Sequence, residues 1–257
     1  MALTYGGYLK LDELLALQVA QSDGPEHDEM LFIVIHQVYE LWFKLVLHEV
    51  RQIQRTLEGG DTPTALATFK RVLTIFKTLV AQVDILETMT PVSFLSFRDR
   101  LDTASGFQSW QFRQVEFALG ARNRALAGHY AEVAPELAGH LEEPSLYDSF
   151  LQYLAHKGYP VPQEALERNR AEPPREDPEV QKLLIDAYHH DSATRDVCER
   201  MVDLDEGLQE WRYRHVKMVE RTIGTRKGTG GSAGAEYLKS TLFNPLFPDL
   251  WAIRPHL

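Results

Sequence analysis

The sequence contains very little cysteine, since Cys198 is the only one among 257 residues. This excludes an intrachain disulfide and a zinc site built from several cysteines, and it fits a reducing cytosol. The N-terminus lacks a basic stretch followed by an unbroken apolar run, so we expect no signal peptide. The most apolar region, residues 30–50, is interrupted by charged side chains and histidines, which a membrane span of about 20 residues rarely tolerates. These absences predict a soluble, cytoplasmic protein without a membrane segment.

Positive charge is also scarce, because 27 Lys and Arg stand against 37 Asp and Glu, giving a net charge of −10. A general nucleic-acid binder normally carries a basic stripe, so nucleic acid is not expected as a partner. Basic residues gather only locally, between residues 212 and 227, which favours a site or a solvated helix face. What the chain does have is an ordinary globular composition, with 44% hydrophobic and 10% aromatic residues.

The alternation of apolar and polar residues typical of strands is almost absent, whereas apolar stripes with helical periodicity dominate. The pattern predicts helices over residues 31–57, 64–89, 92–101, 107–119, 145–156, 179–190 and 192–223, the last one broken near Asp203. Residues 160–178 are rich in proline and charge, which predicts a surface loop. This loop could divide two domains, but the helices on either side look too apolar to stand alone. We therefore predict an all-α fold in which residues 1–257 form a single large helical-bundle domain.

Two of the ten histidines lie on apolar helical stripes. His215 shares a face with Trp211 and Met218, and His36 lies one turn after Phe32. A histidine in such a place loses water and needs a partner for its ring, which a metal, a carbonyl or a carboxylate could supply; a packed core histidine is the alternative. The sequence contains no HExxH motif and no clustered acidic ligands, so zinc and di-iron chemistry are poorly supported. One lone histidine on each of two helices favours haem, which needs a single strong axial ligand.

A glycine-rich run, GTGGSAG at residues 228–234, follows the predicted helix that carries His215. Nucleotide-binding loops follow a strand instead, and neither GK[ST] nor a regular GxGxxG occurs here. A flexible surface loop is one interpretation. The sharper one is a loop that covers a substrate, because Thr229 and Ser232 stand among glycines that allow close approach of the backbone.

Arg98 follows the apolar stretch FLSF, one turn after Phe94. An arginine beside aromatic rings can bind a carboxylate through two hydrogen bonds. The alternative is an ion pair with Asp99 or Glu116. At the N-terminus, Tyr5 and Tyr8 stand where disorder is usual, and contact with another subunit would hold them in place.

Four stretches, TYGGYL, HDEMLFIVIHQVYELWFKL, FRDRLDTASGFQSWQFRQVE and WRYRHVKMVERTIGTRKGTGGSAG, occur in this order. Together they resemble the tryptophan 2,3-dioxygenase family, from residue 4 to about residue 251, with a weaker match over residues 123–203. The resemblance implies an all-helical, haem b-dependent homotetramer, a dimer of dimers. It also implies an enzyme that adds both atoms of O₂ across the indole C2=C3 bond of L-tryptophan. The product is N-formyl-L-kynurenine, in the first step of tryptophan catabolism by the kynurenine pathway.

The resemblance also implies roles for single residues. His215 corresponds to the proximal haem ligand, and His36 to the distal histidine that contacts the indole N–H. Arg98 would bind the substrate carboxylate, and Thr229 the ammonium and carboxylate groups. The other positions implied to contact the substrate are Phe32, Phe94 and Ser105 in the pocket, and Tyr5, Tyr8 and Leu9 on an arm, residues 1–22, exchanged with a neighbouring subunit.

Some relatives carry tyrosine at the position of Phe94, and the related indoleamine dioxygenases lack the distal histidine. His36 therefore places the chain on the tryptophan-specific branch. Two alternatives remain at this point: a haem enzyme of the same superfamily that hydroxylates its aromatic substrate, and a non-catalytic helical haem sensor or interaction protein. The second leaves the arginine and the Gly-Thr loop beside the histidine without a purpose.

Overall fold

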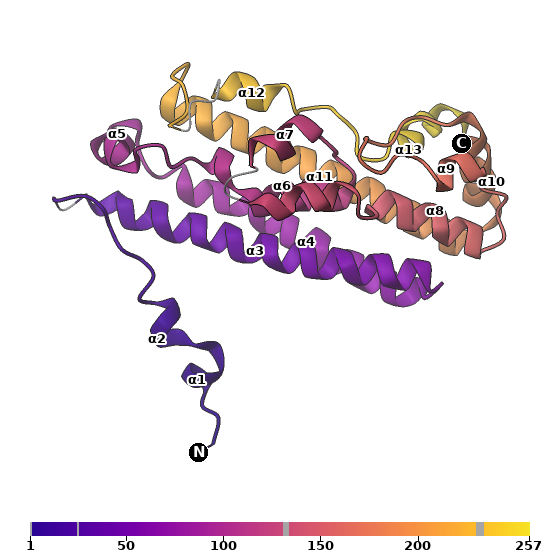
Figure 1. Ribbon diagram of the computed structural model, residues 1–257, viewed down its shortest axis with the longest axis horizontal. Helices are drawn as coiled ribbons and strands as arrows, with labels where there is room; N and C mark the ends of the chain where they lie inside the picture. The colour runs from indigo at the N-terminus through magenta and orange to yellow at the C-terminus, as the bar shows by residue number, and fades with distance from the viewer. Residues whose placement is uncertain (1, 25, 131–133, 230–233) are drawn as a thin grey trace.

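Three long helices form the frame of the molecule in the computed structural model, which describes residues 2–24, 26–130, 134–229 and 234–257. They are α3 (His27–Glu58), α4 (Thr62–Leu86) and α11 (Ser192–Ile223). Helix α4 returns along α3 after a short turn, and α11 packs against α4 (Figure 1). No strand occurs in the described ranges, which confirms the predicted all-α fold.

Shorter helices complete the bundle around this frame. Helices α6 (Trp110–Leu119) and α8 (Leu146–His156) pack on α3, whereas α10 (Pro178–His190) packs on α11. The remaining α-helices are α1 (Tyr5–Leu9), α2 (Leu11–Leu14), α5 (Pro91–Phe97), α7 (Arg124–His129), α9 (Gln163–Leu166), α12 (Ala235–Lys239) and α13 (Pro248–Ala252). Short 3₁₀ helices are η1 (Arg98–Leu101), η2 (Gly106–Gln108), η3 (Pro135–Leu141) and η4 (Arg254–His256).

The helix starts follow from side chains that accept the free N–H groups of the first turn. Asp61 accepts from the backbone of Thr64 at the start of α4, and Asp191 does so for Thr194 at the start of α11. Thr90 caps α5, where Pro91 occupies the first turn, a position that needs no N–H.

Several predicted boundaries were wrong in detail. The first long helix begins at His27 rather than at residue 31, and the second spans Thr62–Leu86 rather than residues 64–89. The helix predicted over residues 92–101 divides into α5 and η1, and the one over 107–119 divides into η2 and α6. The break expected near Asp203 does not occur, because Met201, Leu204 and Leu208 are buried core residues of a continuous α11.

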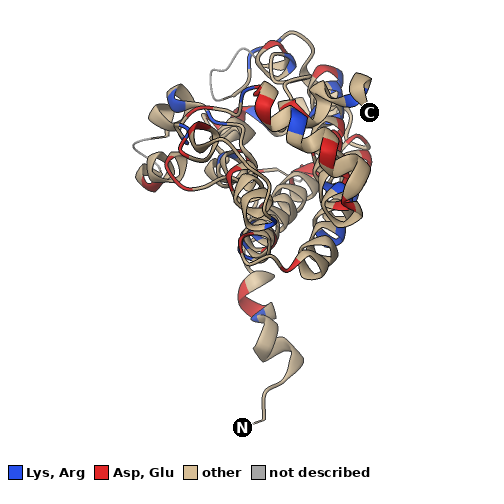
Figure 2. Cartoon of the chain, turned by 90° about the vertical axis from the view of Figure 1, so that its right-hand side faces the viewer, with Lys and Arg blue, Asp and Glu red and all other residues tan. Residues whose placement is uncertain are grey.

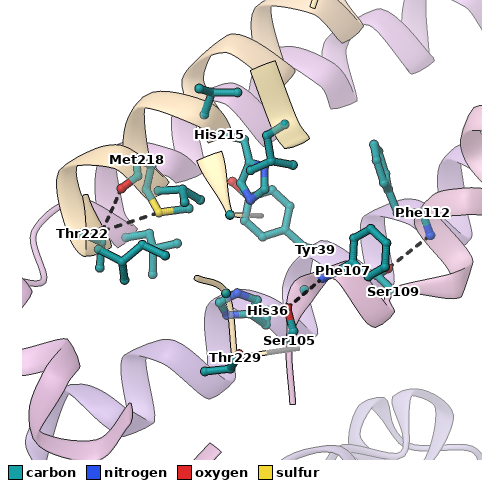
Figure 3. Close-up of a pocket in the computed structure, with 18 of the residues that line it drawn as sticks. His36, Tyr39, Ser105, Phe107, Ser109, Phe112, His215, Met218, Thr222 and Thr229 are labelled. Carbon is teal, nitrogen blue, oxygen red and sulfur yellow. Dashed lines mark hydrogen bonds between the residues drawn. The ribbon is translucent and has the colours of Figure 1, made fainter. Parts of the chain in front are cut away.

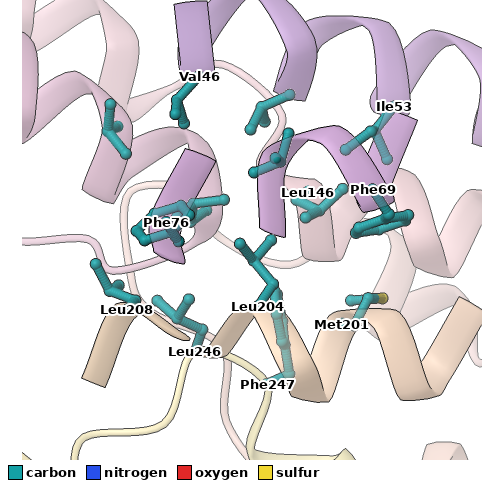
Figure 4. Packing of buried hydrophobic residues seen from close by; sticks show 14 of the residues in the cluster. Val46, Ile53, Phe69, Phe76, Leu146, Met201, Leu204, Leu208, Leu246 and Phe247 are labelled. Carbon is teal, nitrogen blue, oxygen red and sulfur yellow. The ribbon is translucent and has the colours of Figure 1, made fainter. Parts of the chain in front are cut away.

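The core lies where α3, α4, α8 and α11 meet (Figure 4). Figure 4 shows Val46 and Ile53 of α3 and Phe69 and Phe76 of α4 facing Leu204 of α11 across this contact. The C-terminal tail reaches the same cluster through buried side chains that include Leu246, Phe247, Leu250 and Ile253. The tail is therefore part of the packed body.

The N-terminal segment with α1 and α2 projects from the bundle (Figures 1 and 2). Neither of these two helices contains a buried residue. Leu3, Tyr5, Tyr8, Leu15 and Leu17 expose between 62% and 76% of their surface. So much exposed apolar surface on one segment is typical of a contact with another molecule.

One described helix, α3, is long and apolar enough to cross a membrane by length and composition. The core helix of a soluble protein passes the same test. Helix α3 packs against α4, α6 and α8, and acidic and basic residues are spread over the helical body in Figure 2. We therefore assign α3 to the core of the bundle.

Candidate active site

A cavity opens at one end of the bundle, between α3, α4, α5, α6 and α11. It comprises about 1600 Å³ of space, part of it open to solvent, and apolar side chains form most of its wall. A largely apolar wall that carries a few polar groups is typical of a small-molecule binding site.

His215 projects from α11 into this cavity (Figure 3). Its ring stacks on the indole of Trp211, with 5.3 Å between centroids and 6° between the planes. No hydrogen bond involves its ring nitrogens within the part of the chain that the structure describes. Burial lowers the pKa of His215 to about 4, and the nearby His36 and Arg113 act in the same direction. The imidazole is therefore neutral at pH 7, with a lone pair available to a metal.

His36 projects from α3 toward the same space (Figure 3). Its Nδ1 lies 2.7 Å from the carbonyl oxygen of Phe32, and since a carbonyl can only accept, Nδ1 carries the proton. Burial lowers the pKa of His36, although this hydrogen bond and the charge of Glu40 oppose the shift. The neutral ring therefore leaves Nε2 as a hydrogen-bond acceptor. The ring centroid of Phe32 lies 4.1 Å from that of His36.

Arg98 and Thr229 link the segment that follows α5 to the segment that follows α11, at the rim of the cavity. Arg98 Nη2 donates to the carbonyl oxygen of Lys227 at 2.7 Å, and Thr229 Oγ1 donates to that of Ala104 at 2.5 Å. Both side chains line the cavity. Among the described residues Arg98 forms no ion pair with Asp99 or Glu116, and Glu116 binds two other arginines instead.

Aromatic rings and a short turn form the rest of the predicted pocket. Phe94 lies 5.8 Å from Phe32 between ring centroids and 5.5 Å from Phe97. Ser105 lines the cavity and caps η2 by accepting a hydrogen bond from Phe107 N at 3.3 Å. This cap fixes the chain in the turn between α5 and α6.

The structure thus brings seven of the predicted site residues to one cavity, namely Phe32, His36, Phe94, Arg98, Ser105, His215 and Thr229. It does not bring Tyr5, Tyr8 and Leu9 there, because they lie on the projecting arm and are exposed. Ser232, singled out in the glycine-rich run, lies outside the described residues.

Polar residues that sequence reasoning missed also line the cavity. Glu40 accepts hydrogen bonds from Ser109 Oγ at 2.6 Å and Gln111 Nε2 at 2.9 Å, which ties α3 to the start of α6. Arg113, Glu116 and Arg212 form a second group. Arg212 could have been identified as a cavity residue because it lies one turn before His215 on the same helix. No local pattern, however, pairs it with residues about 100 positions earlier.

The donor set suits a haem better than a bare metal ion. No group of three or more His, Cys, Asp or Glu side chains that could hold a metal ion occurs among the described residues. A neutral imidazole with a free ring nitrogen, beside a largely apolar cavity, can supply one axial ligand of a haem. His215 fits this description.

The fold is an all-helical bundle with a largely apolar cavity, and His215 in its wall could serve as the ligand of a cofactor. The family model described as tryptophan 2,3-dioxygenase matches residues 1–134 and 192–257. The chain therefore belongs to the tryptophan 2,3-dioxygenase family. The unmatched residues 135–191 fall within the region where the motifs were weakest.

Three relatives illustrate the similarity. The tryptophan 2,3-dioxygenase of Herpetosiphon aurantiacus is 55% identical over 258 residues, covering 100% of this chain and 99% of that protein. The one of Anaeromyxobacter sp. strain K is 58% identical, covering 98% of this chain and 96% of its own length. The one of Pseudomonas fluorescens is 40% identical, covering 100% and 92%. Similarity thus extends over the whole chain.

Proposed function

We propose that the chain is a haem b-dependent dioxygenase that oxidises L-tryptophan to N-formyl-L-kynurenine. Membership of the family supports this proposal. The observation that carries it is that His215 and His36, both neutral, project into one cavity from different helices (Figure 3). Arg98 and Thr229 lie at the rim of the same cavity.

In this proposal His215 holds the haem iron, which supplies activation of O₂ for addition to the indole ring. The protein's own contribution is mainly to position the substrate. The rings of Phe32 and Phe94 form an apolar wall for the indole. The lone pair on Nε2 of His36 can accept the indole N–H, because Phe32 O keeps the proton on Nδ1. No strong base is required of His36, which agrees with its lowered pKa.

Arg98 and Thr229 would hold the amino-acid end of the substrate. A guanidinium binds a carboxylate through two charge-assisted hydrogen bonds, and a threonine hydroxyl can accept from an ammonium group. In the structure these two side chains bond instead to the carbonyls of Lys227 and Ala104. Binding of tryptophan would therefore replace these two contacts with contacts to the ligand, which would itself bridge the two segments of the rim and help to exclude water.

We also propose that the arm, residues 1–22, completes the site of a neighbouring subunit in a homotetramer. Tyr5, Tyr8 and Leu9 expose 76%, 71% and 41% of their surface and contribute nothing to the cavity of their own chain. Contact with another copy would bury these side chains. The proposed location is the cytoplasm.

Spectroscopy and turnover test the proposal together. The purified protein should show a Soret band, and after anaerobic reduction the addition of O₂ and L-tryptophan should produce N-formylkynurenine absorbance. His215→Ala should abolish haem retention. Arg98→Ala should keep the haem and weaken tryptophan binding by at least about tenfold, since a charged hydrogen-bonding partner is lost. A His215→Ala protein with full haem content would exclude the ligand assignment.

A further inference from the structure

Glu40 contributes a half-buried carboxylate to the cavity wall, one turn after His36 on α3. Its Oε1 accepts a hydrogen bond from Ser109 Oγ at 2.6 Å, and its Oε2 accepts one from Gln111 Nε2 at 2.9 Å. The Gln111 amide also donates to the backbone carbonyl oxygen of Glu40 at 2.7 Å. Ser109 caps α6, and Gln111 lies in its first turn. These hydrogen bonds link the helix that carries His36 to the start of α6.

Through Ser109 the link reaches the Ser105 turn, residues 105–109, which leads into α6. The Ser109 hydroxyl donates to Glu40 and accepts from Phe112 N at 3.2 Å, and these contacts fix its direction (Figure 3). Ser109 N donates at 3.1 Å to a carbonyl oxygen within η2, the 3₁₀ helix of the same turn. A shift of the Glu40 carboxylate would therefore be passed to the turn as a whole.

The Ser105 turn and His36 belong to the same site. Ser105 and His36 both line the cavity (Figure 3), and Ala104, just before the turn, accepts the hydrogen bond from Thr229 at the rim. In the proposed reaction the indole ring would lie between groups that these two segments supply. A displacement of about 1 Å at such a site can reduce a rate by about 100-fold. The reaction therefore depends on the spacing between the two segments.

A second effect of Glu40 must be separated from these contacts. Burial lowers the pKa of His36, and the charge of Glu40 opposes this shift, so the carboxylate could act on His36 through its charge alone. Both partners of the carboxylate are neutral side chains. Glutamine at this position would therefore remove the charge and retain hydrogen bonds. Among the described residues, those that line the cavity do not include Gln111, so Gln111 can affect the reaction only through the position of other groups.

We propose that Glu40 is a positioning residue, whose hydrogen bonds to the start of α6 hold the Ser105 turn at the distance from His36 that the indole ring requires. This inference rests on the proposed function, because it assumes that tryptophan is the substrate. Glu40 itself is not required to contact the reacting atoms. Its loss should affect turnover more than binding, since the groups at the rim still hold the amino-acid end of the substrate.

Steady-state kinetics of the reduced, haem-loaded protein test the proposal. Glu40→Ala should lower kcat at least about tenfold and leave the KM for tryptophan within about threefold. Glu40→Gln should retain at least about a third of the kcat, because the amide still accepts from one partner and donates to the other. Gln111→Leu should lower kcat about threefold or more. The double variant should lie within about twofold of Glu40→Ala, because both changes break the same link.

Glu49→Ala is the matched control. Glu49 is a carboxylate of the same helix, 6% exposed, and it pairs with Arg71 of α4 at 2.7 Å, so its loss should reduce stability and leave kcat unchanged. Hydrogen exchange of the apoprotein gives a readout without turnover. In Glu40→Ala the backbone amides of residues 105–112 should exchange at least about tenfold faster, and in Glu49→Ala they should not.

An unchanged kcat in Glu40→Ala would overturn the inference, and so would unchanged exchange of residues 105–112. A Glu40→Gln protein as slow as Glu40→Ala would also overturn it, because the charge of Glu40 rather than its contacts would then matter. Losses that add in the double variant would show that Glu40 and Gln111 act separately, with the same consequence. Failure of the unaltered, haem-loaded protein to oxidise tryptophan would instead refute the proposed function, and this result needs no variant.

Discussion

The two cavity histidines show how much one residue's surroundings decide. From the helical pattern alone, His215 and His36 could each have been a packed core residue. In the structure, His36 is fixed by a backbone carbonyl, whereas His215 stacks on Trp211 with its nitrogens unbonded in the described part of the chain. Both neutral rings keep a nitrogen with a free lone pair, so the family, and not this difference in bonding, assigns the metal to His215 and the substrate contact to His36.

A first prediction concerns the pH dependence of apoprotein stability. The pKa of His215 is lowered to about 4 in the fold, against about 6.5 when unfolded, so the unfolded chain binds more protons between these values. The contribution of His215 to the free energy of unfolding should therefore be fully present above pH 6.5. It should fall by up to about 3 kcal/mol as the pH drops toward 4. Urea unfolding of the apoprotein measures this. His215→Gln should flatten the profile, and an unchanged slope in that variant would contradict the assigned pKa.

Other residue roles could not be predicted from sequence because they depend on distant partners. The contact of Arg98 with the Lys227 carbonyl spans 129 positions, and that of Arg212 with Glu116 spans 96. The family motifs predicted Arg98 and Thr229 as site residues. No local pattern showed that these side chains connect the two segments that form the rim. The arginine group in the wall escaped notice for the same reason.

At the scale of elements, helical periodicity predicted the main helices well and their ends poorly. The stripe of apolar residues locates α3, α4 and α11, because each buries one face. It does not reveal a kink such as that at Ser109, which has ψ of 89° between η2 and α6. The break expected near Asp203 does not occur, and Asp205, two residues further along α11, is buried and bonded to the tail.

The position of the rim segment after α11 should depend on Gly234. This residue has φ of +62°, and a Cβ placed there would lie 2.8 Å from the carbonyl oxygen of Arg226. Gly234→Ala should displace the segment that carries Thr229 and raise the KM for tryptophan severalfold while haem content stays unchanged.

Gly224→Ala is the control for this effect. Gly224 also has a positive φ, of +60°, but nothing lies within 4 Å of its Cβ position. It should therefore show only the conformational cost of about 1 kcal/mol. Steady-state kinetics would contradict the prediction if the two variants had the same KM.

The attachment of the C-terminal tail to the bundle should depend on Asp205 of α11. Its Oδ2 accepts from Leu246 N at 2.8 Å and from Trp251 Nε1 at 2.9 Å. Asp205→Ala leaves these donors without an acceptor and should lower the free energy of unfolding by about 3 kcal/mol. Asp203→Ala, which removes only a half-exposed ion pair with Arg200, should cost less than about 1 kcal/mol. Equal losses by chemical denaturation would show that the tail is held by other contacts.

At the scale of the whole molecule, the arm is the feature that a single chain does not explain. Deleting residues 2–22 should convert the proposed tetramer into smaller species and raise the KM for tryptophan by at least about tenfold, because exposed apolar side chains lose their partner surface. Light scattering and kinetics measure both effects. Glu13→Ala, on the same arm and 67% exposed at its side chain, should change neither. A deletion variant with unaltered size and KM would refute the exchange of the arm.

The central claim is that this chain adds both atoms of O₂ to L-tryptophan at a haem held by His215. Mass spectrometry of the product formed from isotopically labelled O₂ by the reduced protein tests it most directly. We predict N-formylkynurenine carrying two labelled oxygen atoms, with no such product from the His215→Ala variant. A product with one labelled atom would indicate hydroxylation, and the absence of any oxidised tryptophan from a haem-loaded protein would indicate a non-catalytic role; either result would contradict the claim.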